Sequence, residues 1–181
     1  MKINFAILAT VSVVATGVSS NVNAGSSTGN LEVKIVITKE CQVNVGSGGT
    51  VSNAVLDFGS KGVLNKAVDG ETAAKGTGSI QVQCTNGTAL KIGLGAGTNA
   101  STANDVNTRR MKSGTEFISY QLYQDTAHKS VWGNTTDTAS NVVSLTADGT
   151  IQSKQIFGQI PAQTTPADGT YTDTVVVSVS Y

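Results

Sequence analysis

The chain has 181 residues, which is enough for one domain with a hydrophobic core. Charged residues make up 13% of it, the formal net charge is +0 and no basic cluster is larger than RRMK at 109–112, so we expect no nucleic-acid partner, because phosphate binding needs a concentrated positive field. Twenty glycines, with abundant threonine and serine, are typical of a β-rich exported protein rather than a helical cytosolic enzyme.

The first 24 residues predict a secretory signal peptide. Lys2 precedes an apolar stretch from Ile3 to Val18, and Val22 and Ala24 are placed as a cleavage signal. A membrane anchor is the weaker alternative, because Thr, Ser and Gly interrupt the apolar stretch. Removal of residues 1–24 leaves 157 residues with 11 basic and 12 acidic side chains, hence a net charge of −1.

The mature chain begins with a long alternating segment. One face of LEVKIVI is apolar and carries Leu31, Val33, Ile35 and Ile37, whereas the other face includes charged side chains. The pattern continues to Val45 and therefore predicts about fifteen residues of extended chain, which is unusually long for one strand. Such a segment could serve two functions in succession.

Further strands are predicted where apolar residues lie between turns rich in Gly, Asn, Asp and Thr. These segments are 54–58, 78–84, 89–94, 118–123, 142–145 and 171–181. No window of adequate length has a convincing 3.6-residue period. Several short strands separated by turns predict an all-β sandwich of immunoglobulin type.

Cys41 and Cys84 are the two cysteines of the chain. An even number in an exported protein predicts a disulfide bond rather than two free buried thiols. Closing a loop of about 44 residues should stabilise the fold by roughly 3 to 4 kcal/mol if the effect is chain entropy. Two cysteines and one histidine cannot supply the four ligands of a usual zinc site, so we expect no metal site and no cofactor.

We expect no enzyme activity and no catalytic residues, because candidate groups are scarce and scattered. His128 is the single histidine and is expected to be a solvated loop residue. GLGAG at 93–97 lacks the helix that follows a dinucleotide fingerprint. Trp132, with Tyr120 and Tyr123 nearby, could form a sugar-stacking surface, but aromatic residues of the core are the better interpretation.

The last thirteen residues, GTYTDTVVVSVSY, predict a strand that runs to the end of the chain. One face of it carries Val175, Val177, Val179 and Tyr181. A strand at a sheet edge leaves backbone groups unpaired beside an apolar face. An alternating segment from a neighbouring molecule could complete it by β-strand addition, so we expect the missing strand to come from the next subunit.

Both ends of the mature chain carry motifs that are found together in one known family. GNLEVKIVITKECQV at the start, QIFGQIPAQTTPADGTYTDTVVVSVSY at the end and the cysteine spacing resemble the archaic chaperone–usher pilins of the spore coat protein U domain family. The most specific element is G-x-Y-x-D-T, which precedes the terminal strand. Residues 54–141 match mainly in their β pattern.

The resemblance implies an incomplete immunoglobulin-like sandwich that is completed by a donor strand from a neighbouring subunit. It implies a periplasmic chaperone, an outer-membrane usher and other pilin subunits or copies of the chain as partners. Export through the periplasm to a surface fimbrium, with roles in adhesion and biofilm formation, is expected from the same resemblance. A secreted monomeric carbohydrate-binding β-sandwich and a spore coat protein are the alternatives.

The resemblance also divides the mature chain. Residues 25–37 would be the donor segment, inserting the apolar face that begins at Leu31, and residues 38–181 would be the pilin domain. The face from Val175 to Tyr181 would line the acceptor groove and contact the chaperone first. Because Val36 is also apolar, a register slip of one residue would exchange the two faces of the donor.

Overall fold

The computed structural model describes residues 25–43, 53–76, 78–135 and 140–181. The predicted signal peptide lies outside these residues. The chain forms two separate units, Met1–Val36 and Ile37–Tyr181. All the strands of the described residues belong to the second unit, which begins one residue before the predicted start of the pilin domain.

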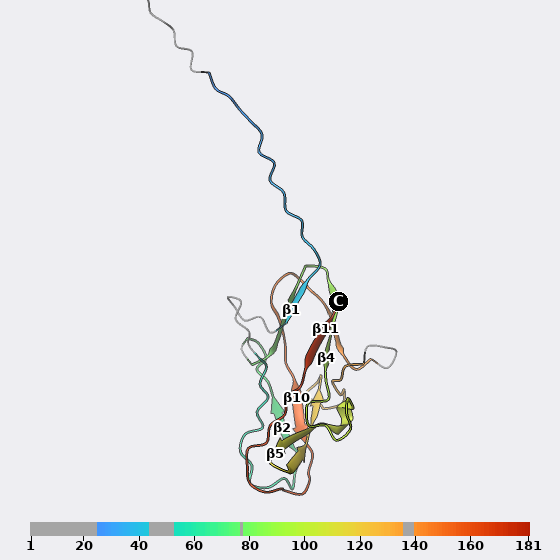
Figure 1. The fold of residues 1–181 in the computed structure, drawn as a ribbon. Coiled ribbons are helices and arrows are strands. Elements are labelled where there is room, and N and C mark those ends of the chain that lie inside the picture. The colour runs from blue at the N-terminus through green and yellow to red at the C-terminus, as the bar shows by residue number, and fades with distance from the viewer. Residues whose placement is uncertain (1–24, 44–52, 77, 136–139) are drawn as a thin grey trace, which may run out of the picture. The chain divides into compact units, whose positions relative to one another are not determined.

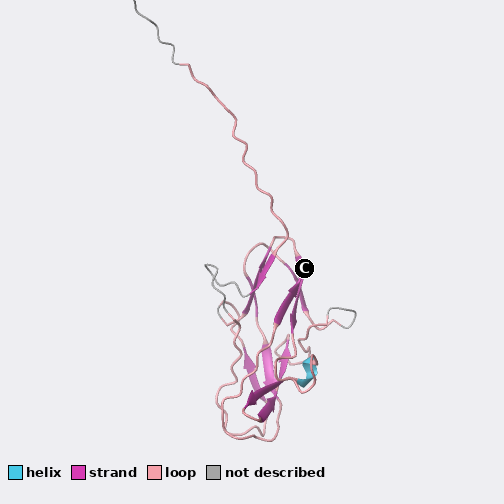
Figure 2. Ribbon diagram, in the orientation of Figure 1, coloured by secondary structure: helices cyan, strands magenta, loops and turns pink. Residues whose placement is uncertain are grey.

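The larger unit is built from short strands and one 3₁₀ turn within the described residues (Figures 1 and 2). In chain order they are β1 (Cys41–Val43), β2 (Val68–Glu71), β3 (Ile80–Cys84), β4 (Ala89–Leu94), η1 (Val106–Thr108), β5 (Arg110–Ser113), β6 (Glu116–Ser119), β7 (Gln121–Tyr123), β8 (Val143–Thr146), β9 (Gln152–Lys154), β10 (Phe157–Ile160) and β11 (Val177–Ser180). The expected all-β class is therefore confirmed.

The strands of the described residues pair in four small sheets. Three have three strands each, in the orders β1–β3–β9, β2–β10–β7 and β11–β4–β8, and the fourth is the hairpin β5–β6. Every one of these pairings is antiparallel. Strands that are distant in sequence are neighbours, as in a sandwich of immunoglobulin type, and both β1 and β11 lie at the end of a sheet order.

One hydrophobic core serves these sheets. Ile80 of β3 and Ile92 and Leu94 of β4 are completely buried, and Trp132 is 1% exposed. Burial of each such aliphatic side chain contributes about 1.5 to 3 kcal/mol to folding. The Trp132 indole Nε1 donates a hydrogen bond to the Ile92 carbonyl oxygen, at 2.9 Å. Trp132 is thus a core residue, and a sugar-stacking surface that includes its ring is ruled out.

Several predicted strands are shorter than their sequence pattern. The apolar alternation predicted for residues 31–45 forms a strand at Cys41–Val43, residues 25–40 have no regular secondary structure, and residues 44 and 45 lie outside the described residues. The segment 118–123 is divided between β6, which ends at Ser119, and β7. At the end of the chain, β11 covers four of the eleven residues expected.

Residues 54–58 were expected to form a strand but belong to no ladder in the described structure. Their alternation has another cause, since Leu56 and Phe58 pack over Gly70 and Gly158, which are partners in the β2–β10 pair. A Cβ atom on Gly158 would lie 2.8 Å from Leu56 Cδ1 and 3.0 Å from Phe58 Cζ. Period-two burial here comes from side-chain packing on a flat glycine pair.

Candidate functional site

β11 is an edge strand within the described residues. Its ladder partner is β4, with Val177 opposite Leu94 and Val179 opposite Ile92. Since Leu94 and Ile92 are fully buried, Val177 and Val179 lie on the side of β11 that meets the core. The other edge of β11 has no described strand against it, so its backbone can accept one more strand (Figure 1).

The inward face of the terminal segment is incompletely covered. Val175, Val177 and Val179 pack against the core but are only half-buried. In contrast, the intervening Val176 is 68% exposed, so the segment alternates as a strand at a surface does. The predicted face is the one that meets the core, and its role in accepting a donor strand stays a prediction.

Tyr181, the fourth residue predicted for the groove, is 55% exposed. It borders an open hollow of about 610 Å³ together with Leu90 of β4 and Leu145 of β8. Leu90, near the N-terminal end of β4, is buried, whereas Leu145 is half-buried. Tyr181 is therefore placed beside apolar surface rather than within the core.

The sheet β1–β3–β9 has β1 at one end of its order. Cys41 and Val43 of β1 are half-buried and pack on the same core as the valines of β11. Two edge strands thus leave apolar side chains of one core partly open. This arrangement can accept a strand, and it offers no chemistry for catalysis.

Asp173, in the G-x-Y-x-D-T motif, fixes the chain just before β11. Its Oδ1 accepts hydrogen bonds from the backbone N and Oγ1 of Thr98, both at 2.9 Å, and from the backbone N and Nδ2 of Asn99, both at 3.1 Å. Its Oδ2 accepts a hydrogen bond of 2.7 Å from the Tyr120 hydroxyl. Hydrogen bonds to a carboxylate are stronger than neutral ones, so this contact holds the terminal segment to the loop after β4.

Gly97 lies at the centre of this contact. It adopts φ +83, and a Cβ atom at this position would collide with the Asp173 carboxylate. The backbone runs alongside, because Thr98 N donates to Thr174 O at 3.1 Å and Gly95 N donates to Val176 O at 2.9 Å. Gly97 of GLGAG therefore permits the close approach of the Asp173 carboxylate, and nothing in this contact resembles a nucleotide site.

Burial and the hydrogen bond to Asp173 raise the pKa of Tyr120 well above its usual range. The hydroxyl group therefore stays protonated and can donate to the carboxylate at any physiological pH. Asp173 and Tyr120 were not singled out as a pair by the sequence, because 53 positions separate them. The available signal was the G-x-Y-x-D-T motif itself.

Arg109 is a second residue that sequence reasoning missed. It is 1% exposed, and its guanidinium donates hydrogen bonds to the carbonyl oxygens of Leu94, Gly95 and Trp132 and to Gln121 Oε1. Burial lowers its pKa to about 10, so it remains charged at neutral pH. Arg109 thus satisfies the carbonyl groups at the C-terminal end of β4, and β4 is the strand that pairs with β11.

The segment Gly25–Val36 has no regular secondary structure and is exposed throughout. The exposed fractions of Leu31, Val33 and Ile35 are 87%, 86% and 82%. Ile37, at the start of the larger unit, is 70% exposed. Exposed apolar runs of this kind are typical of interaction sites. Because both faces are exposed, the donor register stays a prediction.

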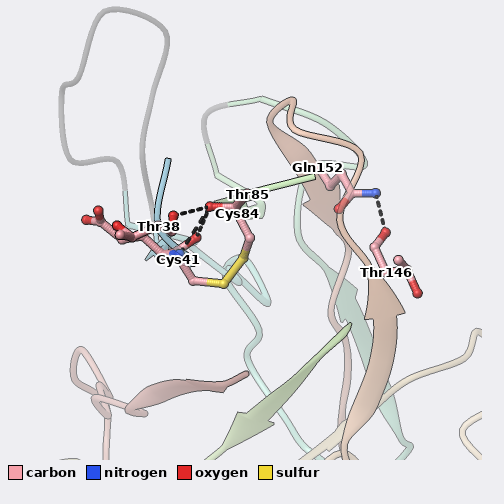
Figure 3. Close-up of a disulfide and its surroundings, with 7 residues drawn as sticks. Thr38, Cys41, Cys84, Thr85, Thr146 and Gln152 are labelled. Atoms are coloured by element: carbon pink, nitrogen blue, oxygen red, sulfur yellow. Dashed lines mark hydrogen bonds between the residues drawn. A yellow bond between two sulfur atoms is a disulfide. The ribbon is translucent and has the colours of Figure 1, made fainter. Parts of the chain in front are cut away.

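A disulfide bond joins Cys41 to Cys84, as predicted, and links β1 to β3 (Figure 3). Thr85 strengthens the junction, since Thr85 Oγ1 donates to the Thr38 carbonyl oxygen at 3.0 Å and accepts from Glu40 N at 3.1 Å. The Thr85 backbone N also donates to Glu40 O at 2.9 Å. Residues 38–41 are thereby fixed to the body of the larger unit.

Catalytic and metal-binding groups do not gather in the part of the chain that is described. It contains no group of three or more His, Cys, Asp or Glu that could hold a metal ion. Nor does a helix long and apolar enough to span a membrane occur there. His128 lies in a loop, as expected, but its side chain is not solvated: it is 16% exposed, and its ring centroid lies 4.9 Å from that of Tyr123.

Residues 27–178 match the model of the Spore Coat Protein U domain. A curated relative, Protein U of Myxococcus xanthus, is 33% identical over 182 residues, which cover 97% of this chain and 95% of the relative. The family match therefore includes most of the exposed N-terminal segment and the first two residues of β11.

A solved structure shares the fold. It is the CsuC–CsuE chaperone–tip adhesion subunit pre-assembly complex from archaic chaperone–usher Csu pili of Acinetobacter baumannii, with a TM-score of 0.51 and 22% identity. The match covers 80% of this chain but only 40% of the solved chain. At this identity the likeness concerns the fold, and it confirms the predicted class.

Proposed function

Because the chain belongs to the Spore Coat Protein U domain family, we propose that it is a structural subunit of an archaic chaperone–usher pilus. Subunits polymerise by donor-strand exchange, in which residues 25–37 of one molecule pair with the free edge of β11 of the next and cover its core. Family membership also agrees with the expectation that the protein is not an enzyme.

The open edge of β11 is the observation that carries this proposal. An edge strand with half-buried valines needs one more alternating strand to complete its ladder and cover its core. The same chain carries an exposed alternating segment with Leu31, Val33 and Ile35. If the exposed segment of one copy pairs with the open edge of β11 of the next copy, the copies are joined end to end.

The partners and location follow from this assembly. A subunit with an uncovered edge requires a periplasmic chaperone that covers it, and an outer-membrane usher that exchanges the chaperone for the next subunit. The chain that grows is a homopolymer or includes other pilin subunits. It lies on the cell surface as a fimbrium and supports adhesion and biofilm formation.

Deletion of residues 25–37 tests the proposal. Expressed with chaperone and usher, the deletion variant should still be captured by the chaperone but should form no fibres, because the acceptor edge is intact and the donor is missing. Co-purification measures capture, and electron microscopy with unheated gels measures fibres. Fibres of normal length from the deletion variant would rule out donation by this segment.

A matched pair of point variants refines the test. Ile35→Asp places a carboxylate on the predicted inserting face, where an uncompensated charge costs several kcal/mol, whereas Lys34→Asp places the same group on the other face. Ile35→Asp should block fibre formation and Lys34→Asp should not. Normal fibres from Ile35→Asp would contradict the assigned face.

A role in a spore coat is the second candidate, favoured by the 33% identity to Protein U of Myxococcus xanthus over nearly the full chain. Immunogold labelling of the native protein separates the two. Labelled filaments on growing cells indicate a pilus, and label confined to a spore surface indicates a coat.

A further inference from the structure

A second hollow, lined by polar side chains, lies among η1, β5, β6, β7 and the end of β10. Its volume is about 310 Å³, at the lower end of the range for small-molecule sites. Arg109 and Arg110 are both in its lining, and no aspartate or glutamate is. None of the residues proposed to accept or donate a strand borders it. Its function is therefore separate from polymerisation.

Arg110 is held in place at this hollow. Its Nε donates a hydrogen bond of 3.1 Å to the Asn99 carbonyl oxygen, and its guanidinium carbon lies 4.0 Å from the centre of the Phe117 ring. Its two terminal nitrogens have no hydrogen-bond partner among the described residues. A guanidinium fixed on one side and available on the other is suited to pair with two oxygens of an anion.

Hydroxyl groups accompany the guanidinium. Ser101, Ser119 and Tyr123 line the same hollow, and their side-chain oxygens make no hydrogen bond within the described part of the chain. Each hydroxyl can both donate and accept. The lining thus combines one available cation with several neutral groups of the kind that meet a polyol or an oxyanion.

Arg109 adds positive charge beneath this lining. Its hydrogen-bond acceptors are carbonyl oxygens and the Gln121 amide oxygen, and no carboxylate of the described residues lies within ion-pair distance. The negative charge of Asp173 favours the protonated form of Arg109, but Asp173 is hydrogen-bonded to Tyr120 and is not part of the lining. Buried charges are normally paired, so a buried cation with no carboxylate in ion-pair contact among the described residues favours a nearby anion.

We propose that this hollow binds a small anionic ligand whose carboxylate or sulfate oxygens pair with the Arg110 guanidinium, while Ser119 and Tyr123 meet its other polar groups. Its volume suits one sugar ring, so an acidic monosaccharide is the expected source of the anion. A free inorganic oxyanion shares the same chemistry.

Calorimetric titration of the full secreted chain at low ionic strength tests this site with three probes. Glucuronate should bind, and glucose, which has similar size and no charge, should not. Binding of inorganic sulfate without glucuronate would assign the site to a free oxyanion instead. If neither glucuronate nor sulfate binds, or if glucose binds as tightly as glucuronate, the proposal is overturned.

Variants on one strand supply the control. Arg110→Gln should weaken binding of the anion by about tenfold or more, because a charge-assisted pair is lost. Lys112→Gln removes the same charge from β5, 5.7 Å from the same Phe117 ring but outside the lining, and should leave affinity within about twofold. Equal losses in both variants would show nonspecific charge attraction and overturn the site. Neither result bears on fibre assembly, which is measured separately.

Discussion

At the scale of single residues, Asp173 determines where the terminal strand begins. One carboxylate holds Thr98, Asn99 and Tyr120, and the segment after it runs beside the chain that leaves β4. These partners lie 53 to 75 positions away, so no local pattern could reveal them. The motif was recognisable from the sequence, but its physical role was not.

Two glycine variants measure how closely this contact is packed. Gly97→Ala should destabilise the protein by roughly 3 kcal/mol or more, because the new methyl group combines a positive φ with a collision at Asp173. Gly87→Ala is the control, since Gly87 has φ +79 but nothing within 4 Å, and it should cost about 1 kcal/mol. Urea unfolding of both variants gives the comparison, and similar losses would contradict the account.

At the scale of elements, the sequence predicted the apolar strands best. The predicted segment 89–94 coincides with β4, because ALKIGL is both apolar and alternating. β2, β5, β9 and β10 were missed. VDGE, RMKS and QSK carry few β-branched or aromatic residues and pair through their tertiary neighbours, and FGQI of β10 is short and interrupted by a glycine. The segment 54–58 was predicted as a strand but is not one, because its alternation reflects the packing of its side chains on glycines.

The candidate site was partly predictable, because its apolar residues alternate along the terminal segment. Period two places Val175, Val177 and Val179 on one face, and the structure turns that face to the core. Length was not predictable, since pairing with β4 covers only Val177–Ser180. The preceding residues are held by Asp173 and by a bridge between Thr172 and Lys112 of β5.

Identical substitutions at neighbouring positions test this face of β11. Val177→Asp should prevent stable folding or chaperone capture, because an unpaired carboxylate in an apolar environment costs several kcal/mol. Val176→Asp, at a position that is 68% exposed, should be recovered at nearly the normal level. Recovery of each variant from a periplasm that contains chaperone and usher is measured on gels. Equal recovery of the two would refute the face assigned to the groove.

At the scale of the whole molecule, the chain carries two apolar surfaces that its own described fold leaves uncovered. One is the segment Gly25–Val36, and the other is the open side of β11 with its half-buried valines. Exposed apolar edges promote uncontrolled association, so a protein with this arrangement needs either a chaperone or a second copy. The proposed mutual completion in a fibre would cover both surfaces at once.

Amide hydrogen exchange along β11 tests this claim most directly. The subunit without residues 25–37 is compared with and without a synthetic peptide of that sequence. In an antiparallel ladder alternate amides point toward β4 and the others point away, so the peptide should slow exchange at alternate positions between Val175 and Ser180. A bound peptide that leaves exchange in β11 unchanged would contradict donor-strand completion at this edge.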